Sequence, residues 1–237
     1  MPDLHWTIPV ARWSSWPAVA AVSPDIGFIE PMVRRRLSTL SRVALKVAHD
    51  CAADHPNVRI VFASRHGELR RTTDILRSIS AGEPVSPTSF SLSVLNAMTG
   101  VFGISRGDRT AASALSAGAE TLGYALLEAH AQYASDKSTS VLLVYADEPA
   151  DPAYGTIEEE VHGGALAILL DDSAATGRLT CARTAAVATD TPHDACASGT
   201  VFATQSQAVH HCLDTRTAAQ WRGEHAAWAW SWHEGVA

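Results

Sequence analysis

The spacing of apolar residues in the first quarter of the chain predicts two strands with a long helix between them. Leu4–Val10 alternates loosely between apolar and polar side chains, as a half-buried strand does. Across Met32–Cys51, apolar side chains recur every three or four positions, which is the period of an amphipathic helix. The apolar run Val58–Ala63 predicts a buried strand. Pro17–Pro31 contains several prolines and a glycine, which indicate a loop.

Helices and strands alternate in the rest of the chain. Helices are predicted at Glu68–Ser80 and Phe90–Phe102, and a strand at Arg109–Ser113 is followed by a helix that opens near Ser116. The later predicted elements are strands at Ser140–Ala146 and Ala165–Asp171, a hairpin partner of the latter at Arg178–Ala186, and a helix at Val201–Leu213. This alternation predicts an α/β fold whose sheet is covered on both faces by helices.

The C-terminal segment carries three tryptophans at alternate positions, Trp228, Trp230 and Trp232. Alternate side chains of a strand lie on the same face, so the three indoles are expected to lie together. The segment is therefore either the closing strand of the chain's own sheet or an aromatic patch that contacts a partner subunit.

Composition narrows the class of protein. With 237 residues, 46% of them hydrophobic and 18% charged, the chain is long and apolar enough to bury a core. No apolar run is long enough to span a bilayer and the N-terminus does not resemble a signal peptide, so we expect a cytoplasmic protein. The four cysteines are widely spaced without a C-x-x-C pair, so we expect reduced thiols, no metal site and no cofactor.

Charge is spread unevenly along the chain. The net charge of −7 argues against a nucleic acid partner. Residues 1–110 contain 13 Lys and Arg against 9 Asp and Glu, whereas residues 111–237 contain 5 against 16. The first predicted helix carries Arg34, Arg35 and Arg36, which form either a solvated face or a contact for an acidic partner.

Residues 109–130 predict a strand, a sharp turn and a helix, with small side chains at the join. The tip of such an elbow faces free N–H groups of the helix, which suits a nucleophile. The tip residue here is Leu115, which has no nucleophilic atom. Ser113 and Ser116 flank it, but each needs an activating base and the sequence nominates none.

The run SALSAGAETLGYAL around Leu115 resembles the active-site elbow of the β-ketoacyl synthases of the thiolase superfamily, with Leu115 at the position of the acyl-accepting cysteine. Ser86–Gly100, Ser140–Glu148 and Gly163–Asp172 resemble three further family segments in the same order. The resemblance covers roughly Val58–Asp172. It implies a thiolase-like fold consisting of a single ketosynthase N-terminal half, with a mixed sheet between helical layers.

The same resemblance implies one domain, with a thiolase-like core at residues 1–198 and a divergent helix and Trp-rich strand at 199–237. The family's H-G-T and N-x-H motifs, which carry its catalytic histidines, are absent. Without the cysteine and these histidines, the chain resembles a chain length factor, the inactive partner of a catalytic ketosynthase. Its short length is similar to that of the truncated factors of aryl polyene pathways. The implied partners are a ketosynthase and an acyl carrier protein.

The resemblance also assigns roles to particular residues. Five candidates line the acyl tunnel or belong to the ordinary core: Phe90, Leu95, Met98, Phe102 and Leu115. Six candidates form the subunit interface, because paired subunits of the family meet along the strand before the elbow: Asn96, Arg109, Thr110, Ala111, Ala112 and Ser113. Docking of the carrier protein is assigned to Arg34, Arg35 and Arg36.

Other functions remain open at this stage. The chain is alternatively a homodimeric scaffold that binds the carrier protein without a ketosynthase, or a small acyl-thioester hydrolase that uses Ser113 or Ser116. His162-Gly163-Gly164 resembles the oxyanion-hole loop of esterases, but no G-x-S-x-G segment supplies their nucleophile. The C-terminal histidines lack a spacing that indicates a metal site.

Overall fold

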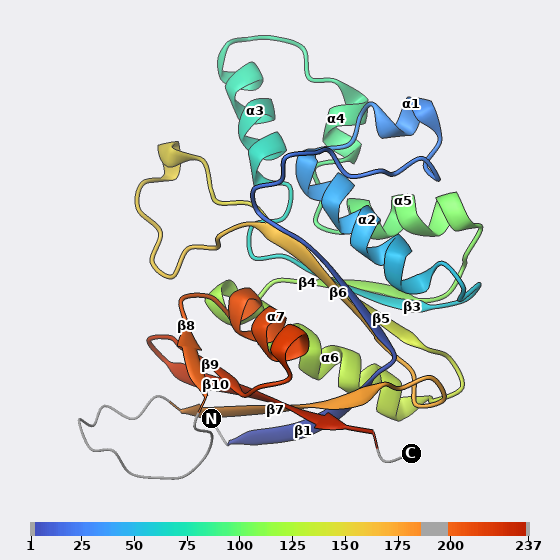
Figure 1. Cartoon of the computed structure of the whole chain (residues 1–237). Helices are drawn as coiled ribbons and strands as arrows, with labels where there is room; N and C mark the ends of the chain where they lie inside the picture. The colour runs from blue at the N-terminus through green and yellow to red at the C-terminus, as the bar shows by residue number, and fades with distance from the viewer. Residues whose placement is uncertain (1–2, 186–198, 236–237) are drawn as a thin grey trace.

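The computed structural model describes residues 3–185 and 199–235, which are arranged in four layers (Figure 1). An outer layer of helices covers one face of a five-stranded sheet. Two helices, α6 (Thr121–Ser135) and α7 (Gln205–Thr215), lie between this sheet and a second five-stranded sheet. The α/β class predicted from the sequence is confirmed, but the described residues form two sheets where the pattern predicted one.

The first sheet, called here the elbow sheet, contains the strand that precedes the elbow. Its strands in spatial order are β2 (Arg12–Trp16), β6 (Gly164–Leu170), β5 (Val141–Asp147), β3 (Arg59–Ala63) and β4 (Ala112–Leu115). β3 is parallel to β4 and β5, whereas β6 is antiparallel to β5 and β2. β4 is therefore an edge strand of this sheet.

The second sheet, called here the tryptophan sheet, joins segments from both ends of the chain. Its strands in spatial order are β1 (Leu4–Val10), β7 (Gly177–Ala185), β10 (Ala226–Glu234), β9 (Ala219–Arg222) and β8 (Thr200–Phe202). β7 pairs with β1 and β10, so the prediction that it forms a hairpin with β6 is wrong. β6 belongs to the other sheet, and Ala186, the last residue of the predicted strand, lies outside the described residues.

The outer layer consists of α1 (Pro31–Arg34), α2 (Thr39–Ala52), α3 (Leu69–Ser80), α4 (Pro87–Ser91) and α5 (Ala97–Arg106). The predicted helix Met32–Cys51 is interrupted after α1, because the Ser38 hydroxyl accepts a hydrogen bond of 3.0 Å from the Ser41 amide and caps α2. No helix in the described part of the chain is long and apolar enough to cross a bilayer.

The predicted helix Phe90–Phe102 is also divided, into α4 and α5. The hydroxyls of Ser91 and Ser93 donate to the carbonyls of Thr88 and Phe90, at 3.0 and 2.8 Å. Such bonds offer the backbone an alternative to continuing the helix. Further along the chain, α7 begins at Gln205, four residues after the predicted start, because Thr204 forms a capping box with Gln207.

The tryptophans of β10 belong to the core between the two sheets. Trp228 and Trp230 are each 1% exposed, and the half-buried Trp232 packs against the same cluster. Trp228 lies so close to α6 that a Cβ atom on Gly123 would approach its ring to 2.5 Å. The interpretation of this segment as a closing strand of the chain's own sheet is therefore confirmed.

Candidate functional site

The elbow places Leu115 at the end of β4, and α6 begins at Thr121, five residues later than predicted. A short 3-10 turn, Gly118–Glu120, fills the interval. The Thr121 hydroxyl accepts from the Ala117 amide at 2.9 Å and donates to the Gly118 carbonyl at 2.6 Å. The strand, turn and helix predicted from the sequence are all present. The half-buried Leu115 side chain packs against the core between the sheets.

Neither serine beside Leu115 is bonded to a base. The Ser113 hydroxyl accepts a hydrogen bond of 3.1 Å from the Gln132 side-chain amide. The Ser116 hydroxyl donates to the Arg65 carbonyl at 2.9 Å. A serine nucleophile requires an imidazole or carboxylate at its hydroxyl, so these contacts give no support to the hydrolase alternative.

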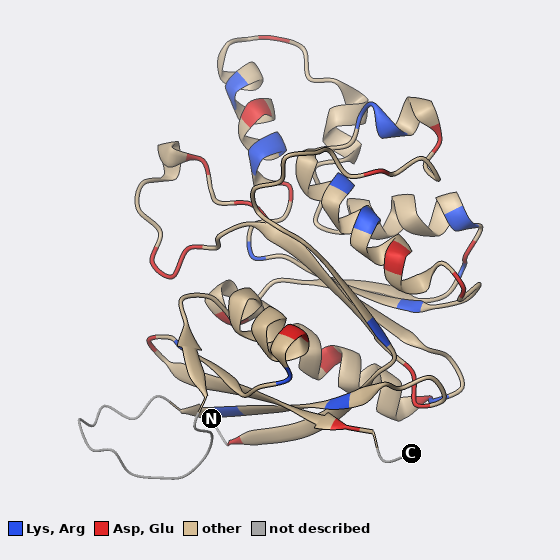
Figure 2. Cartoon of the chain, viewed as in Figure 1, with Lys and Arg blue, Asp and Glu red and all other residues tan. Residues whose placement is uncertain are grey.

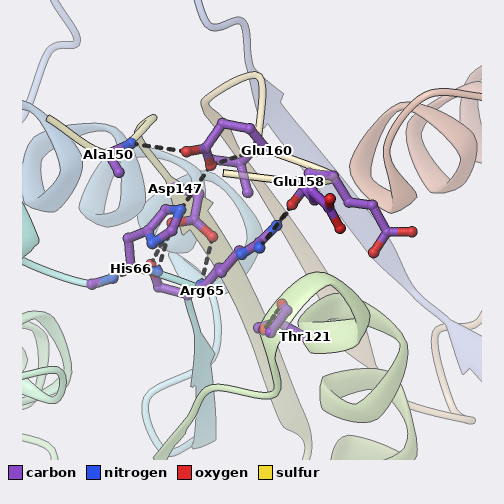
Figure 3. Close-up of polar contacts among 12 residues, drawn as sticks. Arg65, His66, Thr121, Asp147, Ala150, Glu158 and Glu160 are labelled. Carbon is purple, nitrogen blue, oxygen red and sulfur yellow. Dashed lines mark hydrogen bonds and ion pairs between the residues drawn. The ribbon is translucent and has the colours of Figure 1, made fainter. Parts of the chain in front are cut away.

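A polar cluster that the sequence did not reveal lies beside the elbow, where β3 and β5 end (Figure 3). Asp147, the last residue of β5, is 1% exposed. Its carboxylate accepts from the Ser64 hydroxyl at 2.9 Å and from the amides of Arg65 and His66 at 2.6 and 3.1 Å. Burial raises the pKa of Asp147, although these hydrogen bonds favour the ionised form. The cluster fixes the backbone that follows β3.

The same cluster holds the loop 148–163 against the elbow sheet. His66 Nε2 lies 2.7 Å from Glu160 Oε1, and the Arg65 guanidinium donates to the carbonyls of Glu158, at 3.0 Å, and Glu159. Partial burial opposes ionisation of Glu160, but hydrogen bonds from His66 and two backbone amides hold its pKa below the ordinary value. These contacts hold the loop in place. In the described part of the chain, the bonded partner of the His66 ring is the Glu160 carboxylate and not a nucleophile. One feature of the sequence could have revealed this polar cluster: polar residues directly follow two buried strands, which are parallel in the structure.

The five predicted tunnel residues do not meet in one cavity of this chain. Met98 and Phe102 are each 2% exposed in the outer core, whereas Leu115 packs on the opposite face of the elbow sheet. Phe90 is 65% exposed. Phe102 lines a cavity of about 340 Å³ between α5 and β4, and Leu95 lines a separate one of about 200 Å³. Their role in a tunnel therefore stays a prediction about the assembled complex.

The predicted interface residues lie at or near the open edge of the elbow sheet. The Ala111 carbonyl accepts from the Ile60 amide of β3 at 3.1 Å, and the Leu115 carbonyl accepts at 3.3 Å from the amide of Ser64, the residue after β3. In a strand, the N–H and C=O of one residue point the same way, and those of the next residue point the opposite way. The backbone N–H and C=O of Ala112 and Ala114 are therefore directed to the open edge. Asn96, at the start of α5, lines the cavity beside this edge together with Thr110 and Ala112.

The basic residues Arg34, Arg35 and Arg36 lie at the end of α1 in the outer helical layer. Arg35 and Arg36 are exposed, and Arg34 is half-buried. Figure 2 shows further Lys and Arg on the helices of this layer and several Asp and Glu on the loop between β5 and β6. Acidic residues also lie on the outer helices, where Asp50 pairs with Lys46 and Asp74 pairs with Arg77, so the two signs are not fully separated in space.

Residues 11–231 match the family described as "Beta-ketoacyl synthase, N-terminal domain". The chain therefore belongs to this family, and the match extends well into the C-terminal segment that the sequence analysis set apart. No curated protein matches the chain by sequence.

Solved structures confirm the thiolase-like ketosynthase fold. One chain of the complex of the ketosynthase ApeO with its chain length factor ApeC from Xenorhabdus doucetiae matches with a TM-score of 0.74 and 26% identity, over 95% of this chain and 99% of that chain. A chain of the ishigamide ketosynthase/chain length factor matches with a TM-score of 0.56 and 16% identity, over 73% of this chain and 65% of that one. The 3-oxoacyl-(acyl carrier protein) synthase III FabH from Pseudomonas aeruginosa PAO1 matches with a TM-score of 0.51 and 14% identity, over 98% and 99% of the two chains.

Proposed function

We propose that the chain is a non-catalytic chain length factor that pairs with a catalytic β-ketoacyl-ACP synthase in an aryl polyene or fatty-acid-like type II pathway in the cytoplasm. The observation that carries the proposal is a complete elbow with leucine at its tip, in a chain that matches a member of a ketosynthase–chain length factor complex along almost its full length.

The other described thiols do not replace the missing nucleophile. Cys51, Cys181 and Cys212 are free and buried. Burial raises the pKa of Cys51 and of Cys212 to about 12, and it raises the pKa of Cys181 well above the ordinary value. Because the thiolate is the reactive form, these side chains are inert at neutral pH. Cys196 lies outside the described residues.

The open edge at β4 supports pairing with another subunit. The peptide groups of Ala112 and Ala114 face outward, and an unpaired edge of this kind is a template for a strand of a partner. Ile104, which is 85% exposed, lines the cavity beside this edge, so apolar surface accompanies the free backbone groups. We therefore assign the predicted interface of Asn96 and Arg109–Ser113 to this edge.

The experiment that tests the function is reconstitution with a catalytic β-ketoacyl-ACP synthase. We expect a heteromeric complex that condenses acyl units, whereas this chain alone condenses none. Leu115→Cys in the isolated chain will remain inactive, because a thiol at the elbow still lacks groups that handle the decarboxylating thioester. The measurements are malonyl decarboxylation and condensation on a carrier protein.

Three results contradict this function. They are a ketosynthase that gives the same rate and products without this chain, condensation by the isolated Leu115→Cys variant, and tight binding of a carrier protein by this chain alone in place of the ketosynthase. The last result identifies the homodimeric scaffold.

Product length provides a separate prediction about the tunnel. In the reconstituted complex, Met98→Ala will lengthen the product, because removing most of a buried side chain opens apolar space. Phe102→Ala is expected to act in the same direction, and Leu95→Trp will shorten the product by filling space. The measurement is the mass distribution of the released chains.

Two controls separate tunnel volume from other effects. Leu76→Ala, on α3, removes an apolar side chain that is 54% exposed and lines neither of the two cavities beside the elbow, so it should leave product length unchanged. Arg35→Ala, on the outer basic surface, should slow turnover without altering length, because it weakens carrier docking. An unchanged distribution in all three tunnel variants, with the complex intact, shows that these residues do not set length.

A further inference from the structure

A third cavity, besides the two described above, lies away from the elbow, between α7 and the β2–β6 side of the elbow sheet. Its volume is about 620 Å³, within the range of small-molecule sites. We call it the α7 cavity; its walls include Trp16, Ala18, His162, Leu166, Phe202 and His210. No residue of the elbow lines it, and β5 and β3 separate β6 from β4 in the sheet. The cavity is therefore distinct from the site described above.

Flat rings form much of the cavity wall. Trp16 and Phe202 contribute aromatic side chains, and His210 and His211 contribute imidazoles from α7. The His211 ring lies 4.8 Å from that of Phe202, and the His210 ring stands edge-on to Trp13 at 5.6 Å. Rings that are already packed in this way favour a ligand that is itself flat, because it can stack without moving them.

One wall presents a hydrogen-bond donor whose identity follows from its neighbours. The Gln207 side-chain oxygen accepts from the Thr204 amide at 3.3 Å, so its NH₂ group is the one that faces His162. That NH₂ donates to His162 Nδ1 at 2.8 Å. Since Nδ1 accepts, the neutral imidazole carries its hydrogen on Nε2. His162 lines the cavity, so Nε2–H is the ring donor that this side chain has left for an acceptor there.

The charges of the lining exclude an anion as the best ligand. Asp214 is a carboxylate in the wall, and no lysine or arginine lines the cavity. Asp214 is exposed, so solvent screens part of its charge, but a carboxylate ligand would meet that charge without a lysine or arginine to offset it.

The mouth of the cavity adds apolar surface. Pro17 and Ala18 line it, and the apolar run continues outward to Val19 and Val22, which are 90% and 70% exposed. Apolar side chains this exposed contribute little to the core of the chain itself. They extend the apolar surface that a ligand longer than the cavity would contact.

We propose that the α7 cavity binds a neutral, flat, conjugated or aromatic molecule with a carbonyl oxygen that accepts a hydrogen bond from His162 Nε2. The aromatic walls favour a flat ligand, and His162 favours one with a hydrogen-bond acceptor. Asp214 disfavours a ligand that carries a carboxylate in place of the neutral carbonyl. This inference does not depend on the pairing with a ketosynthase.

The test uses the full-length chain and the naphthalene ketone Prodan, a neutral, flat probe whose emission shifts to the blue in an apolar site. We expect saturable binding that ethyl cinnamate displaces better than the cinnamate ion does. Ala18→Trp, which fills the cavity mouth, should weaken binding at least tenfold, equivalent to about 1.4 kcal/mol. Val201→Trp is the control: Val201 neighbours Phe202 in β8, is 53% exposed and does not line the cavity, so this change should alter binding less than twofold. His162→Ala should weaken the ketone but not a naphthalene analogue without the carbonyl.

Several outcomes overturn the proposal. They are no saturable binding by the parent chain, equal effects of the two tryptophan variants, and tighter displacement by cinnamate or by a cationic aromatic amine. The proposal also fails if the parent chain binds no probe and Ala18→Trp abolishes binding of the ketosynthase. Those two results together would identify the cavity as a protein docking site.

Discussion

Replacing Glu120 with alanine will lower the free energy of unfolding by about 3 kcal/mol, because it leaves the charge of Arg183 buried without its partner. Glu120 Oε2 accepts from Arg183 Nε at 2.9 Å and from the Trp228 indole at 2.8 Å. The Arg183 side chain is 6% exposed and that of Glu120 is 19% exposed. Arg183 Nη1 has no hydrogen-bond partner among the described residues. The guanidinium also contacts Tyr124 and the Trp228 ring, but neither residue carries a carboxylate that could replace Glu120.

The hydrogen bond to Glu120 raises the pKa of Arg183, which stays charged at every pH at which the chain folds. The measurement is urea unfolding at neutral pH, followed by fluorescence of the buried tryptophans.

A control on the same strand separates this buried pair from surface pairs. Asp172 bonds Arg178 at 2.8 Å, but the Arg178 side chain is 50% exposed. Asp172→Ala should therefore cost less than about 1 kcal/mol. The double replacement Glu120→Leu with Arg183→Met should recover much of the loss, because no unpaired charge remains. Equal costs for Glu120→Ala and Asp172→Ala would contradict the role of burial.

Replacing Ala112 with proline should abolish assembly with the ketosynthase while the chain stays folded. The Ala112 amide faces the open edge of the elbow sheet and takes no part in the ladder with β3, so the fold tolerates its loss. Once a partner strand covers the edge, the same position becomes interior, where proline removes a donor and introduces a clash. We expect the affinity to fall at least about 100-fold, or roughly 3 kcal/mol.

Two controls make this result specific. Ala112→Val keeps the amide and suits a strand, so the complex should form. Ser113→Pro removes an amide from a residue directed toward β3 and should destabilise the chain itself. The measurements are circular dichroism for the fold and sedimentation for the complex. Normal assembly of folded Ala112→Pro would show that the subunits meet elsewhere.

Local patterns in the sequence determined the buried elements and the nature of the elbow. Leu4–Val10 is a strand with the predicted bounds. The predicted strand Val58–Ala63 starts one residue before the observed one, and Ser140–Ala146 is displaced by one residue at each end. The position of Leu115 at the elbow was also evident, because a strand followed by small residues and a helix is a local signal, although β4 begins three residues later than the predicted strand Arg109–Ser113 and ends two residues later. In each case neighbouring residues are sufficient to decide which side chains are buried.

Only the tertiary structure decided which segments meet. β1 pairs with β7, more than 160 residues away in sequence, and β7 leaves the sheet of its predicted partner β6. Asp147 joins the backbone after β3, and His162 meets Gln207 at the α7 cavity, through contacts between separate elements. The period of apolar side chains reports that a strand has a buried face but not which strand covers its edge. Pairing and site assembly depend on long-range packing and hydrogen bonding, and a local pattern does not record these.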